Sequence, residues 1–522
     1  MKIKALLNMR AEKDGEKPFL YFKNEVIDFS SFIQNVHKAG NMLLGLGVRK
    51  GDHVCLFLPN CPEFLYIWFG LAKIGGVMIP LNVNLRGDGL KYIINHCDAK
   101  WIIVNERFHD AFEFVEKDLT GIQQKIWHGE TLPPNRFQNM ATLMDTAEDT
   151  EPGTIKIEDN DPLGIIYTSG TTGRPKGAVI SHFNYINTGQ MWAENVIDIR
   201  EDDILFTTLP LFHANAQMFT TMGALWSGRP FVLRERFSAS RFFDEIRQYR
   251  ATIFNYIGGM LTMLMKQPEK DSDPVNSARA TFGGAAPREI WQDFERRFDV
   301  TIIEGYGLTE SGGLCIFNPP DAIKVGSIGR PAPFCEISIW DDENKAVPDG
   351  KSGELVVREK EPFSMFLKYY KQPEETENAW TNGWFHTGDK GCMDEDGYYF
   401  FIDRIKDCIR RLGENISSFE IEKIVNSYPE VLESAAVAVP SELGEDEVKI
   451  YVIPKSGKSL NPEDLISYCE ERMAYFMVPR YVEFLKEFPK TPTERTQKFE
   501  LRKIGIGNAW DREKANYKLK RL

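Results

Sequence analysis

Short apolar runs alternate with amphipathic stretches in the first part of the chain. Residues 53–58 (HVCLFL) form an apolar run that predicts a buried strand. Residues 61–74 have helical spacing with aromatic side chains on one side, and residues 77–81 return to an apolar run. A strand, a helix and a second strand within about 30 residues form a βαβ unit, which implies a parallel sheet. The pattern therefore predicts an α/β domain.

The same alternation returns beyond residue 200. We predict further strands at residues 101–104, 204–209, 231–233, 252–256, 280–282 and 301–303, and helices at 30–46, 238–249 and 287–298. Ser238 or Ser240 is the expected N-cap of the helix at 238–249. Residues 118–160 are polar and predict little regular structure. Several predicted strands end in Gly or Pro, and in open α/β sheets ligands bind beyond the carboxyl ends of the strands.

The pattern changes near residue 325. Short alternating strands at 336–340 and 354–357, with turn residues between them, predict a small β-barrel or sheet at about 325–400. A strand at 398–402 leads to residues 403–407. Beyond them the pattern is compact α+β, with helices at 420–427 and 462–473 and strands at 433–439 and 448–454. We therefore expect a large N-terminal domain of βαβ subdomains with the barrel, residues 1–405, and a smaller, mobile α+β domain, residues 406–522.

Composition narrows the class of protein. The 522 residues exceed the roughly 250–300 at which one core stops growing, so more than one domain is expected. The net charge of −13 argues against nucleic acid as a partner. The 8 cysteines show no C-x-x-C spacing, which argues against zinc and favours a reducing compartment. There is neither an apolar run of about 18 residues nor the apolar core of a signal peptide, so we expect a cytoplasmic protein without a transmembrane segment.

The stretch richest in potential ligand-binding groups is residues 167–177, YTSGTTGRPKG. Its glycines let the backbone turn tightly and approach a ligand, so that successive N–H groups converge on an anion. Hydroxyl groups and two cations add further donors. It is not a Walker A loop, because Pro175 precedes Lys176 and Gly177 follows it. The residues predict a phosphate cradle between two strands; an exposed hairpin loop has the same composition and stays open.

Four further segments follow in order: PLFHANAQ at 210–217, GGAAP at 283–287, EGYGLTE at 304–310 and WFHTGD at 384–389. With the glycine-rich loop, these motifs resemble the adenylate-forming enzymes, which include acyl-CoA synthetases, luciferases and peptide-synthetase adenylation domains. The resemblance extends over residues 15–503. NCPEF at 60–64 and WFGLAKI at 68–74 are most similar to the crotonobetaine/carnitine-CoA ligase group.

The resemblance implies an ATP-dependent acid–CoA ligase. In such enzymes a carboxylic acid attacks the α-phosphate of ATP and gives acyl-AMP and pyrophosphate. The small domain then rotates, and the thiol of coenzyme A attacks the acyl carbon. ATP, Mg²⁺, CoA and a small carboxylic acid are the implied ligands. The acid remains open, from carnitine or crotonobetaine to medium-chain or aromatic acids, and we expect a monomer or a homodimer.

The resemblance also assigns roles to single residues. The implied ATP- and AMP-binding residues are Thr168, Ser169, Gly170, Thr171, Thr172, Gly173, Lys176, Gly284, Ala285, Ala286, Glu304, Gly305, Tyr306, Gly307, Thr309, Asp389 and Arg404. Glu310 is the implied Mg²⁺ ligand, and Thr168, His213 and Glu310 are implied catalytic residues. The implied acyl pocket contains His213, Asn215, Gly258, Gly259 and Gly312, with room beside 311–313. Lys406 matches the hinge, and Gly413 and Glu414 match a loop that approaches CoA.

One stretch departs from the family pattern. Relatives commonly have Gly-Lys where this chain has Glu494-Arg495, and that lysine bridges carboxylate and phosphate during adenylation. Arg495 keeps the positive charge in a planar, bulkier group. We favour Arg495 as the catalytic cation; Lys498, or a weakened adenylation step, is the alternative. Two other functions also stay open: an enzyme that passes its acyl group to a carrier protein, and a degenerate protein that binds ATP or acyl-AMP without turnover.

Overall fold

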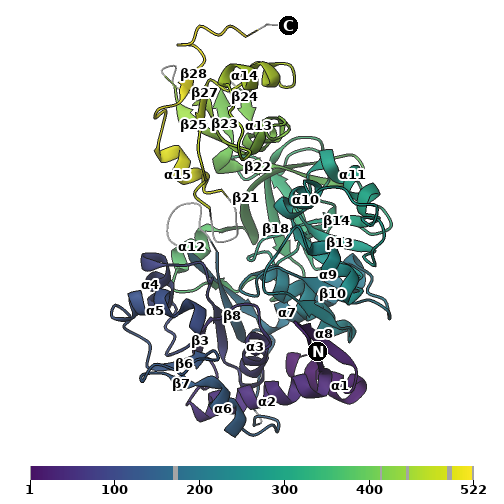
Figure 1. Cartoon of the computed structure of the whole chain (residues 1–522), viewed down its shortest axis with the longest axis vertical. Coiled ribbons are helices and arrows are strands. Elements are labelled where there is room, and N and C mark those ends of the chain that lie inside the picture. Colours follow the sequence, from purple (N-terminus) through teal and green to yellow (C-terminus); the bar gives the residue numbers. More distant parts are fainter. Residues whose placement is uncertain are drawn as a thin grey trace.

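The computed structural model describes residues 2–153, 155–168, 175–411, 414–441, 446–490 and 496–519. A large α/β part carries a smaller α+β part at one end, at the top of Figure 1. The two parts meet where strand β22 (Tyr399–Arg404) leads through a short 3₁₀ turn, η4 (Ile405–Asp407), into the C-terminal part. The predicted fold class is confirmed, whereas the domain boundary at residue 406 stays a prediction.

One sheet contains both strands that flank the glycine-rich loop. Its order over the described residues is β19-β9-β8-β4-β3-β5-β6-β7, and strands β8, β4, β3, β5, β6 and β7 run parallel. Their bounds are β3 His53–Phe57, β4 Val77–Pro80, β5 Trp101–Asn105, β6 Gln124–His128, β7 Gln138–Asn139, β8 Pro162–Thr168, β9 Lys176–Ser181 and β19 Lys368–Tyr369. The predicted βαβ unit is confirmed as β3, α3 (Pro62–Ile74) and β4.

A second large sheet has the order β16-β15-β14-β13-β12-β10-β11-β1-β2. Strands β14, β13, β12, β10, β11 and β1 are parallel, so their carboxyl ends share one edge. The bounds are β1 Pro18–Phe22, β2 Glu25–Asp28, β10 Leu205–Thr207, β11 Phe231–Leu233, β12 Ile253–Ile257, β13 Ala280–Gly284, β14 Thr301–Tyr306, β15 Ile316–Phe317 and β16 Arg330–Pro331.

Helices connect these strands and close the core between them. Helices α2 and α3 pack against each other, and Trp68, Phe69 and Phe32 lie fully buried there. The helices of the large part are α1 Ile3–Asp14, α2 Phe29–Gly45, α4 Gly87–His96, α5 His109–Glu116, α6 Met140–Thr146, α7 His182–Met191, α8 Met222–Ser227, α9 Phe242–Tyr249, α10 Gly258–Met265, α11 Arg288–Phe298 and α12 Pro373–Asn378. Two π-helical segments, η2 Trp192–Val196 and η3 Asn215–Thr221, extend α7 and precede α8.

The remaining strands build one antiparallel sheet and the small C-terminal part. The antiparallel sheet joins β17 Cys335–Trp340, β18 Gly353–Glu359, β20 Trp380–Thr381, β21 Trp384–Met393 and β22. The C-terminal part contains β23 Ile409–Arg411, β24 Glu414–Ile416, α13 Ser418–Asn426, β25 Val431–Pro440, β26 Asp446–Pro454, α14 Pro462–Glu470, β27 Tyr481–Phe484, α15 Lys498–Lys503 and β28 Trp510–Asp511. No described helix combines the length and the apolar character that crossing a membrane requires.

Two expectations about local structure are wrong. The polar segment 118–160 contains β6, β7 and α6, because Ile126 and Trp127 are buried as β6 extends the sheet beyond β5. Helix α9 begins at Phe242 with Arg241 as N-cap, and no side chain caps it, so neither Ser238 nor Ser240 has the predicted role.

Candidate active site

The ends of the glycine-rich loop are fixed by strand pairing. Strands β8 and β9 are antiparallel neighbours, and Thr168 lies opposite Lys176. The Thr168 hydroxyl donates to Glu310 Oε1 at 3.1 Å, which ties the loop to the end of β14. The ammonium of Lys176 pairs with Glu375 and lies 5.0 Å from the centre of the Tyr369 ring. The predicted Ser169, Gly170, Thr171, Thr172 and Gly173 lie outside the described residues.

Glu310 is the buried acid at this point. Its side chain is held at Oε1 by Thr168 and by the Tyr369 hydroxyl, which donates at 3.0 Å. Burial and the Glu310 charge both raise the pKa of Tyr369, so that its hydroxyl remains a donor. A carboxylate oriented in this way at a phosphate loop suits Mg²⁺, which prefers hard oxygen ligands and often takes few of them from the protein. Among the described residues, Glu310 therefore fits the ion.

A second cluster joins β14 to the antiparallel sheet. The Tyr306 hydroxyl donates to Asp389 Oδ2 at 2.7 Å, and Arg404 Nε lies 3.2 Å from Asp389 Oδ1. Asp389 and Arg404 are directly opposite each other on β21 and β22, so their pairing follows from strand register. Burial and the nearby Asp389 carboxylate raise the pKa of Tyr306. The structure brings these three predicted residues together.

The glycines of the EGYGLTE segment allow close packing of backbone. A Cβ at Gly305 would lie 2.8 Å from Leu314 Cδ1 and from Phe282 Cε2, and one at Gly307 would lie 2.4 Å from the Gly313 carbonyl oxygen. Thr309 follows in a turn where its carbonyl accepts from the Gly312 N–H at 3.3 Å. The segment thus brings Tyr306 and Glu310 to the same edge of the sheet.

Glu304 has a different environment from the one that nucleotide binding would give it. Its Oε1 accepts from the Ala285 N–H at 2.5 Å, and its Oε2 accepts from the Ala286 N–H at 3.0 Å and from the Tyr256 hydroxyl. Both oxygens are therefore engaged inside the protein. The carboxylate thus contacts the loop containing Gly284, Ala285 and Ala286, and nucleotide binding by Glu304 stays a prediction.

The segment with His213 follows β10 and is held by two buried amides. Asn60 accepts from the Leu211 N–H at 2.8 Å and donates to the Leu209 carbonyl at 2.9 Å. Gln217 donates to the Leu211 carbonyl at 2.5 Å. The His213 ring lies 4.5 Å from the Phe212 ring, centre to centre. These contacts fix the segment but assign His213 no chemical role.

The predicted acyl-pocket residues have different surroundings, and a pocket at Asn215, Gly258 and Gly259 stays a prediction. Asn215 accepts from Asn255 Nδ2 at 2.7 Å, and Gly258 and Gly259 begin helix α10 directly after β12. A Cβ at Gly259 would meet only Met263 Cε, at 3.9 Å. At Gly312 the expectation of open space is wrong, because a Cβ there would lie 2.4 Å from the Ser364 carbonyl oxygen. The backbone of residue 364 occupies that position.

Lys406, the predicted hinge residue, lies in the 3₁₀ turn η4 between the two parts. Burial lowers the pKa of Lys406, and the positive charge of Lys176 lowers it further. Arg502 of α15 donates to the Lys406 carbonyl at 2.8 Å and pairs with Asp407. The C-terminal part also contacts the large part through an ion pair of 2.5 Å between Lys423 and Glu289.

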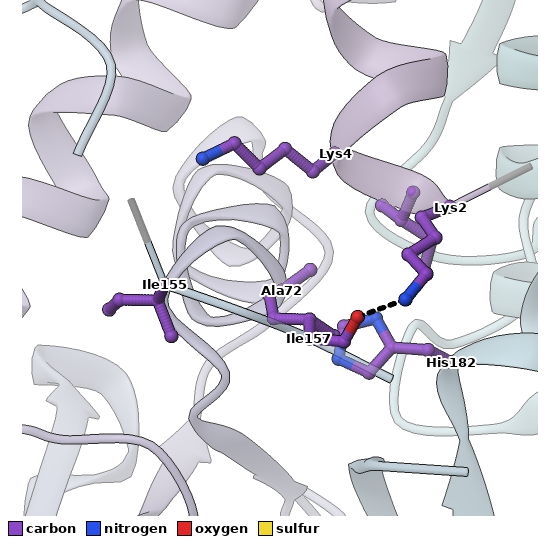
Figure 2. Close-up of a pocket in the computed structure, with 7 residues that line it drawn as sticks. Lys2, Lys4, Ala72, Ile155, Ile157 and His182 are labelled. Atoms are coloured by element: carbon purple, nitrogen blue, oxygen red, sulfur yellow. Dashed lines mark hydrogen bonds between the residues drawn. The ribbon is translucent and has the colours of Figure 1, made fainter. Parts of the chain in front are cut away.

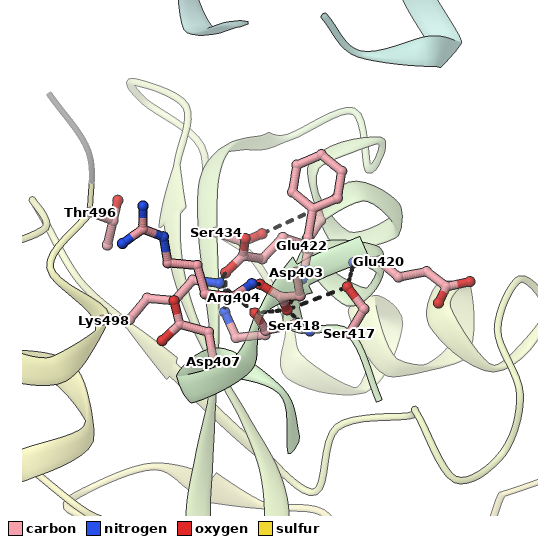
Figure 3. Close-up of polar contacts among 12 residues, drawn as sticks. Asp403, Arg404, Asp407, Ser417, Ser418, Glu420, Glu422, Ser434, Thr496 and Lys498 are labelled. Atoms are coloured by element: carbon pink, nitrogen blue, oxygen red, sulfur yellow. Dashed lines mark hydrogen bonds and ion pairs between the residues drawn. The ribbon is translucent and has the colours of Figure 1, made fainter. Parts of the chain in front are cut away.

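Lys498 lies in a buried charged cluster of the C-terminal part (Figure 3). Its Nζ donates to Ser418 Oγ at 2.6 Å and lies 2.8 Å from Glu422 Oε1. Burial disfavours its charge, but the carboxylates of Glu422, Asp403 and Asp407 outweigh burial and raise the pKa of the lysine. The ammonium is thus engaged within the protein and apart from the Thr168–Glu310 contact. Arg495 and Gly413 lie outside the described residues, and Glu414 is placed only as the first residue of β24.

Asp403 holds the same cluster to the end of β22. Its Oδ2 accepts from the Ser418 N–H and the Ser418 hydroxyl, both at 2.6 Å, and from the Ser417 hydroxyl at 3.3 Å. The carboxylate therefore satisfies N–H groups at the start of α13, where an anion is favoured.

A cavity of about 80 Å³ lies elsewhere, at the beginning of helix α7 (Figure 2). Lys2, Lys4 and the buried His182 border it, together with aliphatic side chains. Burial lowers the pKa of His182 to about 4, so the ring is neutral at pH 7. The cavity is far smaller than typical pockets for nucleotide-sized ligands, which measure about 300–1,000 Å³.

Some residues of the site were not predicted from the sequence. Tyr256 and Asn255 end a predicted strand, so the rule on carboxyl ends could have identified them. Tyr369 and Glu375 follow no recognisable periodicity, and only the folded chain brings them to Glu310 and Lys176.

Comparison with known proteins establishes the family. Residues 7–370 match the model of the AMP-binding enzyme family, and residues 420–495 match that of the AMP-binding enzyme C-terminal domain. The chain belongs to the AMP-binding enzyme family. One curated member, the crotonobetaine/carnitine–CoA ligase of Salmonella agona (strain SL483), is 34% identical over 486 residues, which cover 91% of this chain and 94% of the relative. The Salmonella typhi protein of the same name has the same identity and coverage.

Solved structures of other AMP-binding enzymes have the same fold. The anthranilate CoA ligase AuaEII, in complex with anthranoyl-AMP, is 28% identical with a TM-score of 0.89, and the match covers 96% of this chain and 97% of that one. ATP-bound MatB from Rhodopseudomonas palustris is 24% identical with a TM-score of 0.85, over 96% of this chain and 99% of that one, and it supports the fold alone.

Proposed function

We propose that this AMP-binding enzyme is an ATP-dependent acid–CoA ligase that works through an acyl-AMP intermediate. One observation carries the proposal: the segment 304–310 joins two side-chain clusters. In one, Thr168 donates a hydrogen bond to Glu310; in the other, Asp389 accepts from Tyr306 and forms an ion pair with Arg404. These residue types suit a triphosphate, a ribose and a purine. The names of the curated relatives and the anthranilate CoA ligase structure support the same class of reaction.

In the first half-reaction, a carboxylate oxygen of the acid attacks the α-phosphorus of ATP. The new C(O)O–P bond forms while the bond to the pyrophosphate oxygen breaks. Thr168 and Lys176, at the two ends of the phosphate loop, donate to phosphate oxygens, and Asp389 accepts from ribose hydroxyls. Glu310 would hold Mg²⁺, and the ion would supply positive charge that offsets the negative charge of the phosphates. Arg495 supplies the cation that bridges the acid and the α-phosphate.

In the second half-reaction, the CoA thiol attacks the acyl carbon and AMP leaves. This step requires the C-terminal domain to turn about Lys406, so that the loop containing Gly413 and Glu414 reaches the pantetheine. His213 lies on a segment that Asn60 and Gln217 hold rigidly, and such a segment suits the orientation of the acid and the entry of the thiol.

The substrate is proposed as a small acid of the carnitine or crotonobetaine type, on the strength of the curated relatives. A protein that hands its acyl group to a carrier is the second candidate, and a binding protein without turnover is the third, motivated by Arg495. We also propose a reducing compartment, the cytoplasm, because all 8 cysteines are free thiols.

A screen of carboxylic acids, betaines among them, tests the proposal. Acid-dependent pyrophosphate release together with a CoA thioester detected by mass spectrometry is the expected result. Pyrophosphate release without a CoA thioester, but with acylation of a carrier protein, would favour the second candidate. ATP binding without pyrophosphate release from any acid would favour the third.

A further inference from the structure

The Glu304 carboxylate is buried where β14 approaches its carboxyl end. Its side chain belongs to a residue that is 4% exposed, and its three hydrogen-bond donors come from two other segments. Tyr256 belongs to β12, and the Ala285 and Ala286 N–H groups belong to the loop that follows β13. One carboxylate therefore joins three neighbouring strand ends.

The loop after β13 has a conformation that needs such support. Ala285 has a φ of +66°, in the left-handed region that is disfavoured for residues with a Cβ. Two successive N–H groups at residues 285 and 286 point at the same carboxylate. A carboxylate accepts several hydrogen bonds at once, whereas an amide or a carboxylic acid of the same shape must use one of its two heteroatoms as a donor. These three donors are thus satisfied better by an ionised carboxylate than by a carboxylic acid or an amide.

The same loop borders the nucleotide residues. Gly283 lies opposite Glu304 in the register of β13 and β14, and Tyr306 follows two residues later. A Cβ at Gly283 would lie 2.2 Å from the Tyr256 carbonyl oxygen, so the backbone is tightly packed on one side. The opposite side of the loop presents only backbone and the small side chains of residues 284–286. Such a surface lets a flat purine ring pack against it.

We propose that Glu304 is a positioning residue: as a carboxylate, it holds the backbone of residues 284–286 in the shape that receives the adenine ring. The inference rests on the proposed function, since it assumes that the site binds an adenine nucleotide. It assigns Glu304 no contact with the ligand. Loss of the carboxylate disorders the loop and weakens adenine binding, while the phosphate-loop contacts of Thr168 and Lys176 remain.

A pH dependence follows from this arrangement. Burial raises the pKa of Glu304 to about 7, against the lowering effect of Tyr256 and the two N–H groups. Tyr256 is the titratable side chain that faces it, and no charged side chain of the described residues shifts its pKa. Protonation leaves one backbone N–H without an acceptor. Adenine binding is therefore strongest at about pH 8 and above, where the carboxylate is ionised, and falls as the pH drops through 7.

The test measures the affinity of the full-length chain for adenosine, by calorimetry between pH 6 and pH 8. Adenosine carries no phosphate, so the ligand does not titrate in this range. The variants are Glu304→Gln, which is isosteric and neutral, and Tyr256→Phe, which removes one donor. Glu295→Gln is the matched control, because Glu295 accepts from the Ile302 N–H at 2.9 Å near the opposite end of β14.

The wild type and Glu295→Gln should lose about tenfold in adenosine affinity from pH 8 to pH 6, the typical cost of one unpaired buried donor. Glu304→Gln should bind about tenfold more weakly at pH 8 and show no pH dependence, and Tyr256→Phe should move the midpoint to higher pH. Wild-type affinity with the wild-type pH profile in Glu304→Gln would overturn the inference, as would a flat profile in the wild type. Failure of the wild type to bind ATP at any pH would instead overturn the proposed function.

Discussion

Replacing Lys498 by Met should destabilise the C-terminal domain rather than abolish the chemistry. The change keeps most of the side-chain volume but removes the ammonium that lies 2.8 Å from Glu422 Oε1 and 2.6 Å from Ser418 Oγ. The side chains of Lys498 and Glu422 are only 15% and 13% exposed, so water compensates little for the lost partner. Breaking a buried ion pair on one side typically costs about 3–5 kcal/mol.

Hydrogen exchange of α13 and α15 in the full chain is the suitable measurement, since a two-domain protein need not unfold in a single step. Lys503→Met is the control, because Lys503 lies on the same helix, is 67% exposed and pairs with Glu500, which is itself 41% exposed. An exposed pair of this kind contributes about 0–1 kcal/mol. Adding Glu422→Gln to Lys498→Met should recover part of the loss, which gives a coupling energy of at least about 1 kcal/mol.

The opposite result would refute this reasoning. If Lys498→Met protected α13 and α15 from exchange as well as Lys503→Met did, but stopped pyrophosphate release, then Lys498 would act on the nucleotide. The structural assignment of the cluster would be wrong.

The other predictions concern three separate places. Arg495→Ala should lower acid-dependent pyrophosphate release about 100-fold, which is the usual loss for one electrostatic contact to the transition state. Thioester formation from supplied acyl-AMP should continue. Equal losses in both half-reactions would contradict the assigned role. Gly312→Ala should destabilise the large part by about 3 kcal/mol, because it combines left-handed strain with a Cβ 2.4 Å from the Ser364 oxygen. Gly397→Ala, with a φ of +77° and no atom within 4 Å, should cost about 1 kcal/mol, and hydrogen exchange of the surrounding segments measures both. The folded pKa of His182, about 4, lies below its ordinary value of 6.5, so its contribution to stability is full above pH 6.5 and about 3 kcal/mol is lost as the pH falls to 4. His182→Asn should remove most of this loss of stability when unfolding is measured across the same pH range. If the variant kept the wild-type dependence of stability on pH, groups other than His182 would be responsible for it.

The strands of the two large sheets could be predicted because burial on both faces makes them continuous apolar runs. Strands β3, β11 and β14 begin at the predicted residues for that reason. Strand β6 was missed because polar residues surround Ile126 and Trp127, and only its neighbour β5 makes those two positions interior. The local sequence pattern also predicted the wrong start for α9: the helix begins at Phe242, and no serine caps it.

The residues of the site likewise divide into those that the sequence predicted and those that it did not. Tyr306, Asp389 and Arg404 meet as expected because motif and strand register determine their positions together. The partners Tyr369 and Glu375 come from a segment whose role depends on tertiary packing. Glu304 and Lys498 could be named from the sequence, but their contacts could not. The donors to Glu304 and the acceptors from Lys498 come from segments distant in sequence.

The contacts of the Asp403 carboxylate decide where a fragment containing the C-terminal part should begin. It belongs to β22, yet it satisfies the first N–H groups of α13, which lies beyond the predicted hinge at Lys406. A fragment cut at the pivot, starting at Lys406, would begin its first helix without that acceptor and would leave Lys498 with one negative neighbour fewer. The predicted pivot and the point from which the C-terminal part could fold alone are therefore different, and an autonomous fragment has to start upstream of Lys406.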